Sequence, residues 1–318
     1  MSDEVRLIAD IGGTNARFAL FNEEMGVHRQ LVLHCADHDE IVTAIRTYLS
    51  MVDNPPIREA ALAIATAIVG DEVNMTNHHW SFSIEALKQQ LSLDTLIFKN
   101  DFTALAMSIP RLQASDFVQV GGTVDTSQKT ALGVVGAGTG LGVSGLIPYH
   151  NLWIPLEGEG GHVSLSPANA REVDILKVCW KSFEHVSAER LVSGMGLQNL
   201  YKAICELEGE QPEPLSPREV SVLGMGNANR FCAEALDTFC GLLGSVAGDL
   251  ALTLGAYNGV YIGGGIVPKL GSYFEASSFR ARFEAKGRFS GHLAKVPVFV
   301  IKAENPALYG IGEAFSLT

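Results

Sequence analysis

Three glycine clusters, each placed at the end of an apolar run, constrain the fold of this chain more than any other feature. The first lies in LIADIGGTNARFAL (residues 7–20), where Asp10 and the pair Gly12-Gly13 separate two apolar runs. The second lies in TALGVVGAGTGLGVSGLI (residues 130–147), and the third, Gly263–Gly265, follows GVYI. Such glycines indicate a positive φ or a close approach of the backbone to another group. The first two clusters therefore predict two β-hairpins of similar outline.

Predicted strands and helices alternate along the rest of the chain. Continuous apolar runs predict further strands at Ala60–Gly70, Leu96–Lys99 and within KVPVFVIK (residues 295–302). Apolar residues at helical spacing predict helices at 40–52, 102–109, 174–183, 196–207 and 230–256, and a last helix near Pro306. This alternation predicts an α/β fold.

The two glycine hairpins also predict two lobes with a cleft between them. The expected boundaries are residues 1–110 plus about 302–318 for a small α/β domain and residues 111–301 for a large one. The small residues of Thr103–Ala106, together with Gly310 and Gly312, are expected to let two helices cross closely at the hinge.

Composition limits the class of protein. With 318 residues, 47% hydrophobic and 18% charged, the chain is expected to fold as a globular protein. A net charge of −12 argues against nucleic-acid binding, which needs a basic surface. Five scattered cysteines fit reduced thiols. The acidic start MSDEVRLIAD is unlike a signal peptide, and the uncharged run Thr238–Gly248 is too short to span a membrane. We therefore expect a soluble cytoplasmic protein with no membrane or nucleic-acid partner.

The glycine turns have a chemical interpretation. A glycine turn at a strand end exposes backbone N–H groups that bind oxyanions, and Thr14 and Thr139 add hydroxyl donors. Two such hairpins could hold a polyphosphate from both sides. Asp10 would repel it unless a cation such as Mg²⁺ lay between them. The alternative is that each cluster is only a tight hairpin. The presence of three such clusters at strand ends in one chain favours the interpretation that they bind a ligand.

Familiar nucleotide and hydrolase motifs do not apply. The chain has no G-x-x-x-x-G-K-[ST] and no G-x-S-x-G. GLGVSG (residues 140–145) matches G-x-G-x-x-G, but it leads into a predicted strand, whereas a dinucleotide fingerprint opens a helix.

Several polar residues allow both a structural and a functional interpretation. Asn100 or Asp101, between a predicted strand and a helix, could cap the helix, and Asp101 could instead act as a general base. Glu159 and His162 in GEGGH could bind a small ligand, or be a solvated charge and a packing histidine. Glu189, before a helix, is also an ordinary partner of the helix dipole.

Six motifs in one order point to a family. DIGGTN, NDF, GAGTGLG, GEGGH, SAER and GGGIVP resemble those of the bacterial ATP-dependent glucokinases, members of the actin-like sugar-kinase superfamily. The resemblance runs from Leu7 to the last helix. It implies a two-lobed actin-like ATPase (ribonuclease H-like) fold with the active site between the lobes. The implied reaction transfers a phosphoryl group from MgATP to the 6-hydroxyl of glucose, in the first step of glycolysis.

The resemblance also implies residue roles. Asp101 corresponds to the base for the 6-hydroxyl, and Asn100, Glu159, His162 and Glu189 to the groups that hold the sugar. Asp10 is expected to hold Mg²⁺, directly or through water. The residues that the resemblance assigns to ATP are Asp10, Gly12, Gly13, Thr14, Asn15, Gly138, Thr139, Gly264 and Gly265. Family members are often homodimers. The alternatives are a kinase for another hexose and a non-catalytic, sugar-sensing regulatory protein.

Overall fold

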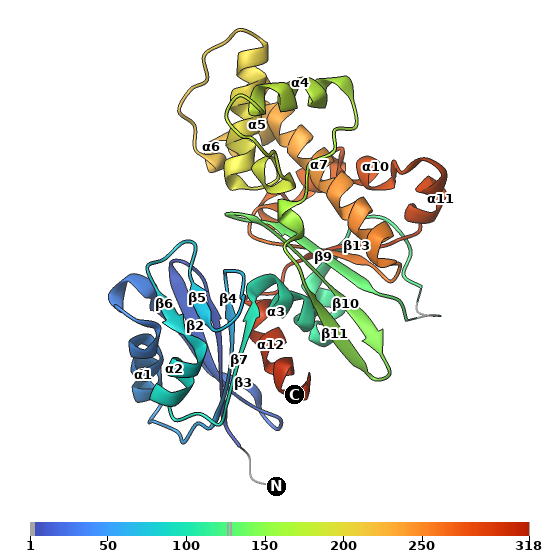
Figure 1. The fold of residues 1–318 in the computed structure, drawn as a ribbon. Helices are drawn as coiled ribbons and strands as arrows, with labels where there is room; N and C mark the ends of the chain where they lie inside the picture. Colours follow the sequence, from blue (N-terminus) through green and yellow to red (C-terminus); the bar gives the residue numbers. More distant parts are fainter. Residues whose placement is uncertain (1–3, 126, 128, 318) are drawn as a thin grey trace. The chain divides into compact units, whose positions relative to one another are not determined.

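The computed structural model describes residues 4–125, 127 and 129–317, which form two compact units (Figure 1). The first unit takes in the chain up to Ala114, Trp153–Glu157 and the chain from Ala303; the second takes in Ser115–Leu152 and Gly158–Lys302. The segment Trp153–Glu157 differs from the domain prediction, which placed it in the large domain. Its last residue, Glu157, pairs with Lys99 of the first unit at 2.5 Å. The domain boundaries themselves stay a prediction.

The first unit is built on a mixed sheet with the strand order β3-β2-β1-β4-β7. Its strands are β1 (Arg6–Ile11), β2 (Asn15–Asn22), β3 (Gly26–His34), β4 (Glu59–Ile64) and β7 (Thr95–Asn100). Strands β1 and β2 are antiparallel, which confirms the first predicted hairpin, while β1, β4 and β7 are parallel. The strand predicted at Ala60–Gly70 is wrong beyond Ile64, because Thr66 N donates to Ile64 O and turns the chain out of the sheet.

Helices and short strands complete the first unit. They are α1 (Ile41–Met51), β5 (Glu72–Asn74), β6 (Ser81–Ser83), α2 (Ile84–Gln90), α3 (Asp101–Ser108) and α12 (Pro306–Gly312), and the unit also takes in residues 153–157 of β11 (Leu152–Glu157). Helices α3 and α12 lie side by side (Figure 1). A Cβ on Gly310 would collide with the Ala104 carbonyl oxygen and lie 2.6 Å from Ser108 N. The close crossing of these helices, predicted from their small residues, is therefore confirmed.

In the second unit the strands follow one another in the order β10-β9-β12-β13-β8. Their bounds are β8 (Phe117–Gln119), β9 (Leu132–Ala137), β10 (Leu141–Tyr149), β12 (Val260–Gly263) and β13 (Val298–Ile301). Strands β9 and β10 are antiparallel, which confirms the second predicted hairpin. Strand β12 runs parallel to both β9 and β13, as expected for strands joined by helices.

The helices of the second unit are α4 (Ala170–Cys179), α5 (Gly194–Leu207), α6 (Pro217–Met225), α7 (Arg230–Leu254), α8 (Val267–Leu270), α9 (Ser272–Ala276), α10 (Phe279–Glu284) and α11 (Ser290–Leu293). Helix α7 is the central one: Phe239, Leu243 and Ala247 are fully buried in the apolar core. By length and composition α7 could cross a membrane, but 61% of its most apolar window is buried inside the protein. Core helices of soluble proteins pass the same test.

Candidate active site

The first set of predicted site residues lies at one edge of the first unit's sheet. Ile11 at the end of β1 is in register with Ile64 of β4, and Ile64 with Asn100 at the end of β7. Neighbouring strands are about 4.8 Å apart, so the ends of β1 and β7 are roughly 10 Å apart. The turn Gly12–Thr14 and the acid Asp101 therefore follow the carboxyl ends of strands in the same parallel group.

Asn100 and Asp101 together begin α3. Asn100 is the N-cap: its Oδ1 accepts from Phe102 N at 2.9 Å, and its Nδ2 lies 3.4 Å from Thr66 O. Asp101 is the first residue of α3, and its Oδ1 also accepts from Phe102 N at 2.9 Å. The capping interpretation is therefore confirmed for Asn100. These bonds fix the Asp101 carboxylate at the start of a helix, where a negative charge is favoured.

The Gly12–Thr14 turn is held by its surroundings. Gly12 N donates to Asn15 O at 3.0 Å, and neither Gly12 nor Gly13 has a positive φ. Of the two predicted reasons for these glycines, close approach is the correct one for Gly13, where a Cβ would lie 2.8 Å from Asn77 Cβ and O. Cys35 is fully buried beneath the turn; its N donates to Thr14 O at 2.9 Å and its Sγ donates to Gly12 O at 3.3 Å.

Two side-chain oxygens that could bind a cation, from Asp10 and Asn15, flank this turn. The Asp10 side chain is only 16% exposed, and its Oδ2 lies 3.4 Å from Arg17 Nη1. Burial raises the pKa of Asp10, and Arg17 opposes that rise. The Oδ1 of Asn15 is buried without a hydrogen-bond partner. Among the residues that the structure describes, no three His, Cys, Asp or Glu side chains cluster as a metal site. A carboxylate oxygen and an amide oxygen are ligands that suit an ion such as Mg²⁺, which takes most of its other ligands from phosphates and water.

The second set of residues lies on neighbouring strands of the second unit. Gly136 of β9 is in register with Gly263 of β12, so the Gly138–Gly140 turn and Gly264 follow the carboxyl ends of adjacent parallel strands. Gly264 has φ +79°, and a Cβ there would collide with the Ala137 backbone. Local structure therefore requires that glycine.

Gly138 and Gly265 differ from Gly264. A Cβ at either position would have no atom within 4 Å, and neither residue has a positive φ. Neither the backbone nor the packing of the unit therefore explains why these two residues are glycine. Both glycines follow the end of a strand, and the open space beside their backbone would allow a ligand to approach closely.

Glu159, His162 and Glu189 lie on segments that meet at Leu141, the first residue of β10. His162 N donates to Glu159 O at 3.0 Å, and a Cβ on Gly161 would collide with Leu141 O. Glu189 Oε2 accepts from Leu141 N at 2.8 Å. Glu189 is not in the first turn of α5, which begins at Gly194. It lies instead in a single 3-10 turn, Ala188–Arg190, and its carboxylate accepts from the strand that follows the glycine turn, so the α5 dipole is not its partner.

The predicted site residues thus form two groups. Asp10, Gly12–Asn15, Asn100 and Asp101 belong to the first unit, and the others belong to the second. Sequence reasoning missed Cys35, Asn77 and Ser193, which hold these groups in place. Only Ser193 gave a signal, because serine commonly precedes a helix, whereas the contacts of the other two are with residues distant in sequence.

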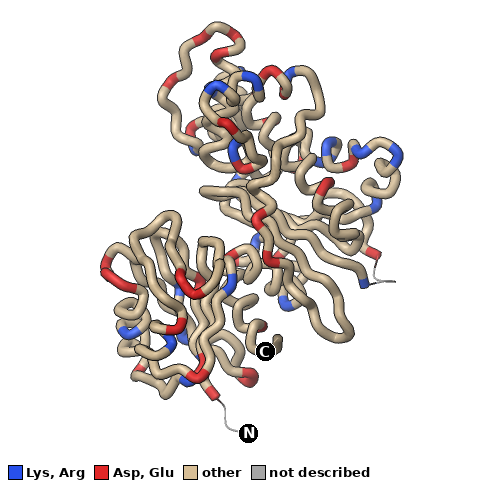
Figure 2. The backbone as a smooth tube through the Cα atoms, viewed as in Figure 1, with Lys and Arg blue, Asp and Glu red and all other residues tan. Residues whose placement is uncertain are grey.

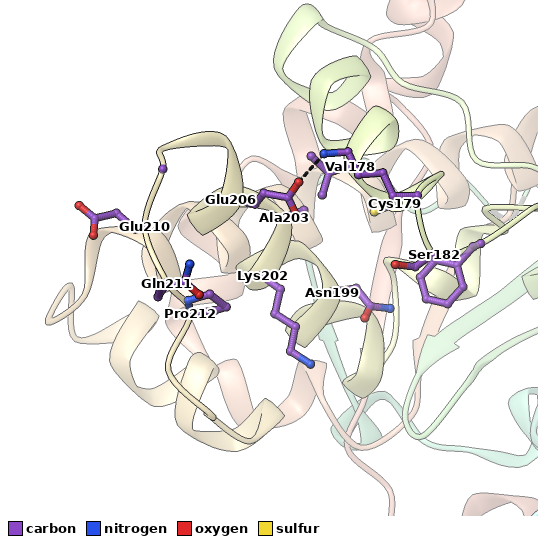
Figure 3. Close-up of a pocket in the computed structure, with 13 residues that line it drawn as sticks. Val178, Cys179, Ser182, Asn199, Lys202, Ala203, Glu206, Glu210, Gln211 and Pro212 are labelled. Atoms are coloured by element: carbon purple, nitrogen blue, oxygen red, sulfur yellow. Dashed lines mark hydrogen bonds and ion pairs between the residues drawn. The ribbon is translucent and has the colours of Figure 1, made fainter.

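A cavity of about 620 Å³ lies elsewhere in the second unit (Figure 3). It lies between α5, the end of α4 and residues 209–212, and Asn199, Lys202 and Glu206 project from α5 beside it. Glu206 pairs with Lys181 at 2.5 Å. None of the predicted site residues lines this cavity, and its charged groups are of both signs.

Comparisons with solved structures identify the fold. A ROK family glucokinase from Streptomyces griseus has a TM-score of 0.62 at 17% identity, covering 98% of each chain. The glucokinase of an Antarctic psychrotroph has a TM-score of 0.88 at 35% identity, covering 100% of each chain. The fold is therefore the actin-like ATPase fold of the sugar kinases, which confirms the predicted fold class.

Sequence comparisons identify the family within that class. The glucokinase family model matches residues 7–317. The glucokinase of Aromatoleum aromaticum is 52% identical over 313 residues, which cover 97% of this chain and 94% of the relative. The chain belongs to the glucokinase family, as its motifs predicted.

Proposed function

We propose that this protein transfers the γ-phosphoryl group of ATP to the 6-hydroxyl of glucose, giving glucose 6-phosphate and ADP. The match to the glucokinase family over residues 7–317 carries this proposal. Purified protein with MgATP and a panel of hexoses tests it, with ADP release followed against a no-sugar control. Glucose-dependent release well above that with mannose or fructose is expected. Glucose binding in a calorimeter without ADP release would instead indicate a sugar-sensing protein.

Asp101 is the proposed base, taking the proton of the 6-hydroxyl as the oxygen attacks the γ-phosphorus. Its position at the start of α3, with Oδ1 held by Phe102 N, supports this role. Asn100, Glu159, His162 and Glu189 are the proposed sugar ligands. Hexose hydroxyls are both donors and acceptors, and an amide, two carboxylates and an imidazole complement them.

The glycine turns are the proposed phosphate-binding groups. Gly12, Gly13, Thr14 and Asn15 offer donors in one unit, and Gly138, Thr139, Gly264 and Gly265 offer them in the other. Mg²⁺ bound with ATP would be held at Asp10 and Asn15 Oδ1, directly or through water, and would neutralise charge on the phosphates. The chain's own donors then fix the γ-phosphoryl group for transfer.

Gly138→Ala tests the phosphate role of the second glycine turn. We expect the dissociation constant for MgATP to rise about tenfold, or about 1.4 kcal/mol. The melting temperature should stay near the wild-type value, because the new Cβ meets no protein atom within 4 Å. Gly291→Ala in α11, where the space is equally open, is the matched control. Unchanged MgATP binding by Gly138→Ala would remove this turn from the phosphate site.

Asp10→Asn tests the metal role. The substitution keeps the shape of the side chain but removes its charge, so the Mg²⁺ concentration for half-maximal activity should rise about tenfold. A magnesium titration at saturating glucose and ATP measures this. The control is Asp53→Asn, which removes an exposed acid paired with Arg29 at 3.0 Å in the same unit. An identical magnesium dependence in both variants would contradict the assignment.

Cytoplasmic location and a homodimer are further parts of the proposal. All five cysteines are free and buried, which suits a reducing compartment. Acidic and basic residues both occur along the two units (Figure 2), and the net charge of −12 is in keeping with a protein that does not bind nucleic acid. Size-exclusion chromatography with light scattering tests the dimer, since a monomer mass would contradict it.

A further inference from the structure

We propose that the segment Glu189–Gly194 braces the Gly138–Leu141 turn and thereby couples the binding of sugar to the binding of nucleotide. This inference rests on the proposed function, which assigns Glu189 to the sugar and the turn to the phosphates. The new element is a physical link between the two ligands, made by the chain itself within the second unit.

The brace holds the turn at both ends. Glu189 Oε2 accepts from Leu141 N at 2.8 Å, where β10 begins. Gly194 N donates to Gly138 O at 2.9 Å, where β9 has ended. Between these points the turn is closed by its own bond, from Gly138 N to Gly140 O at 2.8 Å. A Cβ on Gly140 would collide with Glu189 Oε2, so the carboxylate lies directly against the turn.

The segment that carries these contacts is itself fixed. Ser193, only 2% exposed, donates from Oγ to Glu189 O at 2.8 Å and accepts from Gly196 N at 3.0 Å as the N-cap of α5. The side chains of Leu191 and Val192 are buried in the core. A displacement of Glu189 is therefore transmitted through Ser193 to the start of α5 and through Leu141 to the glycine turn.

Glu189 has the capacity for both tasks. A carboxylate has two oxygens with about four acceptor positions, so Oε2 can hold Leu141 N while the group also accepts from a sugar hydroxyl. A sugar that binds the other carboxylate oxygen further restricts the carboxylate and hence the turn, so part of the conformational entropy of ordering the turn is lost before the nucleotide binds. The second ligand consequently binds more tightly, and by linkage each ligand strengthens the other by the same factor.

Calorimetric titration with MgADP, in the absence and presence of glucose, tests the brace. In the wild type, glucose should tighten MgADP binding. Glu189→Ala should weaken MgADP binding about tenfold without any sugar, because a charge-assisted hydrogen bond to the turn is lost. Glu189→Gln keeps an oxygen that can accept from Leu141 N, so its sugar-free affinity should stay within about twofold of the wild type while the glucose effect falls.

Two further variants act on the brace without removing the Glu189 carboxylate. Gly140→Ala should displace that carboxylate and weaken sugar-free MgADP binding about tenfold. Ser193→Ala should weaken it about threefold. The matched control is Ser83→Ala in the first unit, where Oγ likewise caps a helix, accepting from Ala86 N, and donates to Asp71 Oδ2. That control should leave nucleotide affinity unchanged.

Sugar-free MgADP affinity equal to the wild type in folded Glu189→Ala or Gly140→Ala would overturn the proposal. Equal losses in Ser193→Ala and Ser83→Ala would also overturn it, because the effect would then belong to any helix cap. The proposed function fails by a different result, the absence of glucose-dependent ADP release from the wild type. The sugar-free affinities for MgADP do not depend on that assay.

Discussion

Replacing Asp101 by asparagine is expected to lower kcat for glucose about a thousandfold while changing the dissociation constant for glucose by no more than about threefold. The amide oxygen can still accept from Phe102 N, so the start of α3 is preserved, but an amide cannot take the proton of the 6-hydroxyl. Steady-state kinetics with saturating MgATP, together with calorimetric titration of glucose, measure the two quantities.

Glu85→Gln is the control for this experiment, because Glu85 is also an acid in the first turn of a helix, α2, in the same unit. It should keep wild-type kcat. An Asp101→Asn variant with kcat near that of the wild type would show that Asp101 is not the base. A large loss of glucose affinity with little change in kcat would make Asp101 a sugar ligand instead.

Replacing Gly310 by valine is expected to destabilise the protein by about 3 kcal/mol or more. The added atoms would collide with the Ala104 carbonyl oxygen and crowd Ser108 N, so α3 and α12 would have to move apart. Because α3 begins with Asp101, activity should fall with stability. Urea denaturation measures the free energy of unfolding, with Gly291→Ala as the control in open space. If Gly310→Val kept the unfolding midpoint of the wild type, α3 and α12 would be able to move apart with little loss of stability.

Much of the fold could be predicted because its signals are local. The glycine turns between apolar runs predicted both hairpins, and helical spacing predicted α1 and α7 to within a few residues of their ends. Strand β3 was missed because most of its side chains are partly or fully exposed, so its sequence lacks a clear apolar face. Helix α6 was missed although Ser216 and Glu219 form a capping box, a signal that can be recognised in the sequence itself.

The candidate site could be predicted only as a set of residues, not as an arrangement. Motif order located the glycine turns, Asp101 and Glu189, and the resemblance to a family supplied their roles. The contacts that position them join residues far apart in the chain, such as Gly13 with Asn77 and Glu189 with Leu141. Sequence patterns report the neighbours of a residue along a strand or helix, and these contacts are set by tertiary packing instead.

The route of the chain has a consequence for biosynthesis. The second unit, apart from one short excursion, is a single stretch that ends at Lys302, whereas the first unit needs the chain from Ala303, including α12. Because α12 packs on α3 and β1, the earlier part of the first unit must wait for α12 to leave the ribosome before its fold is complete. The second unit can fold while translation continues, in reverse of the usual N-terminal-first order.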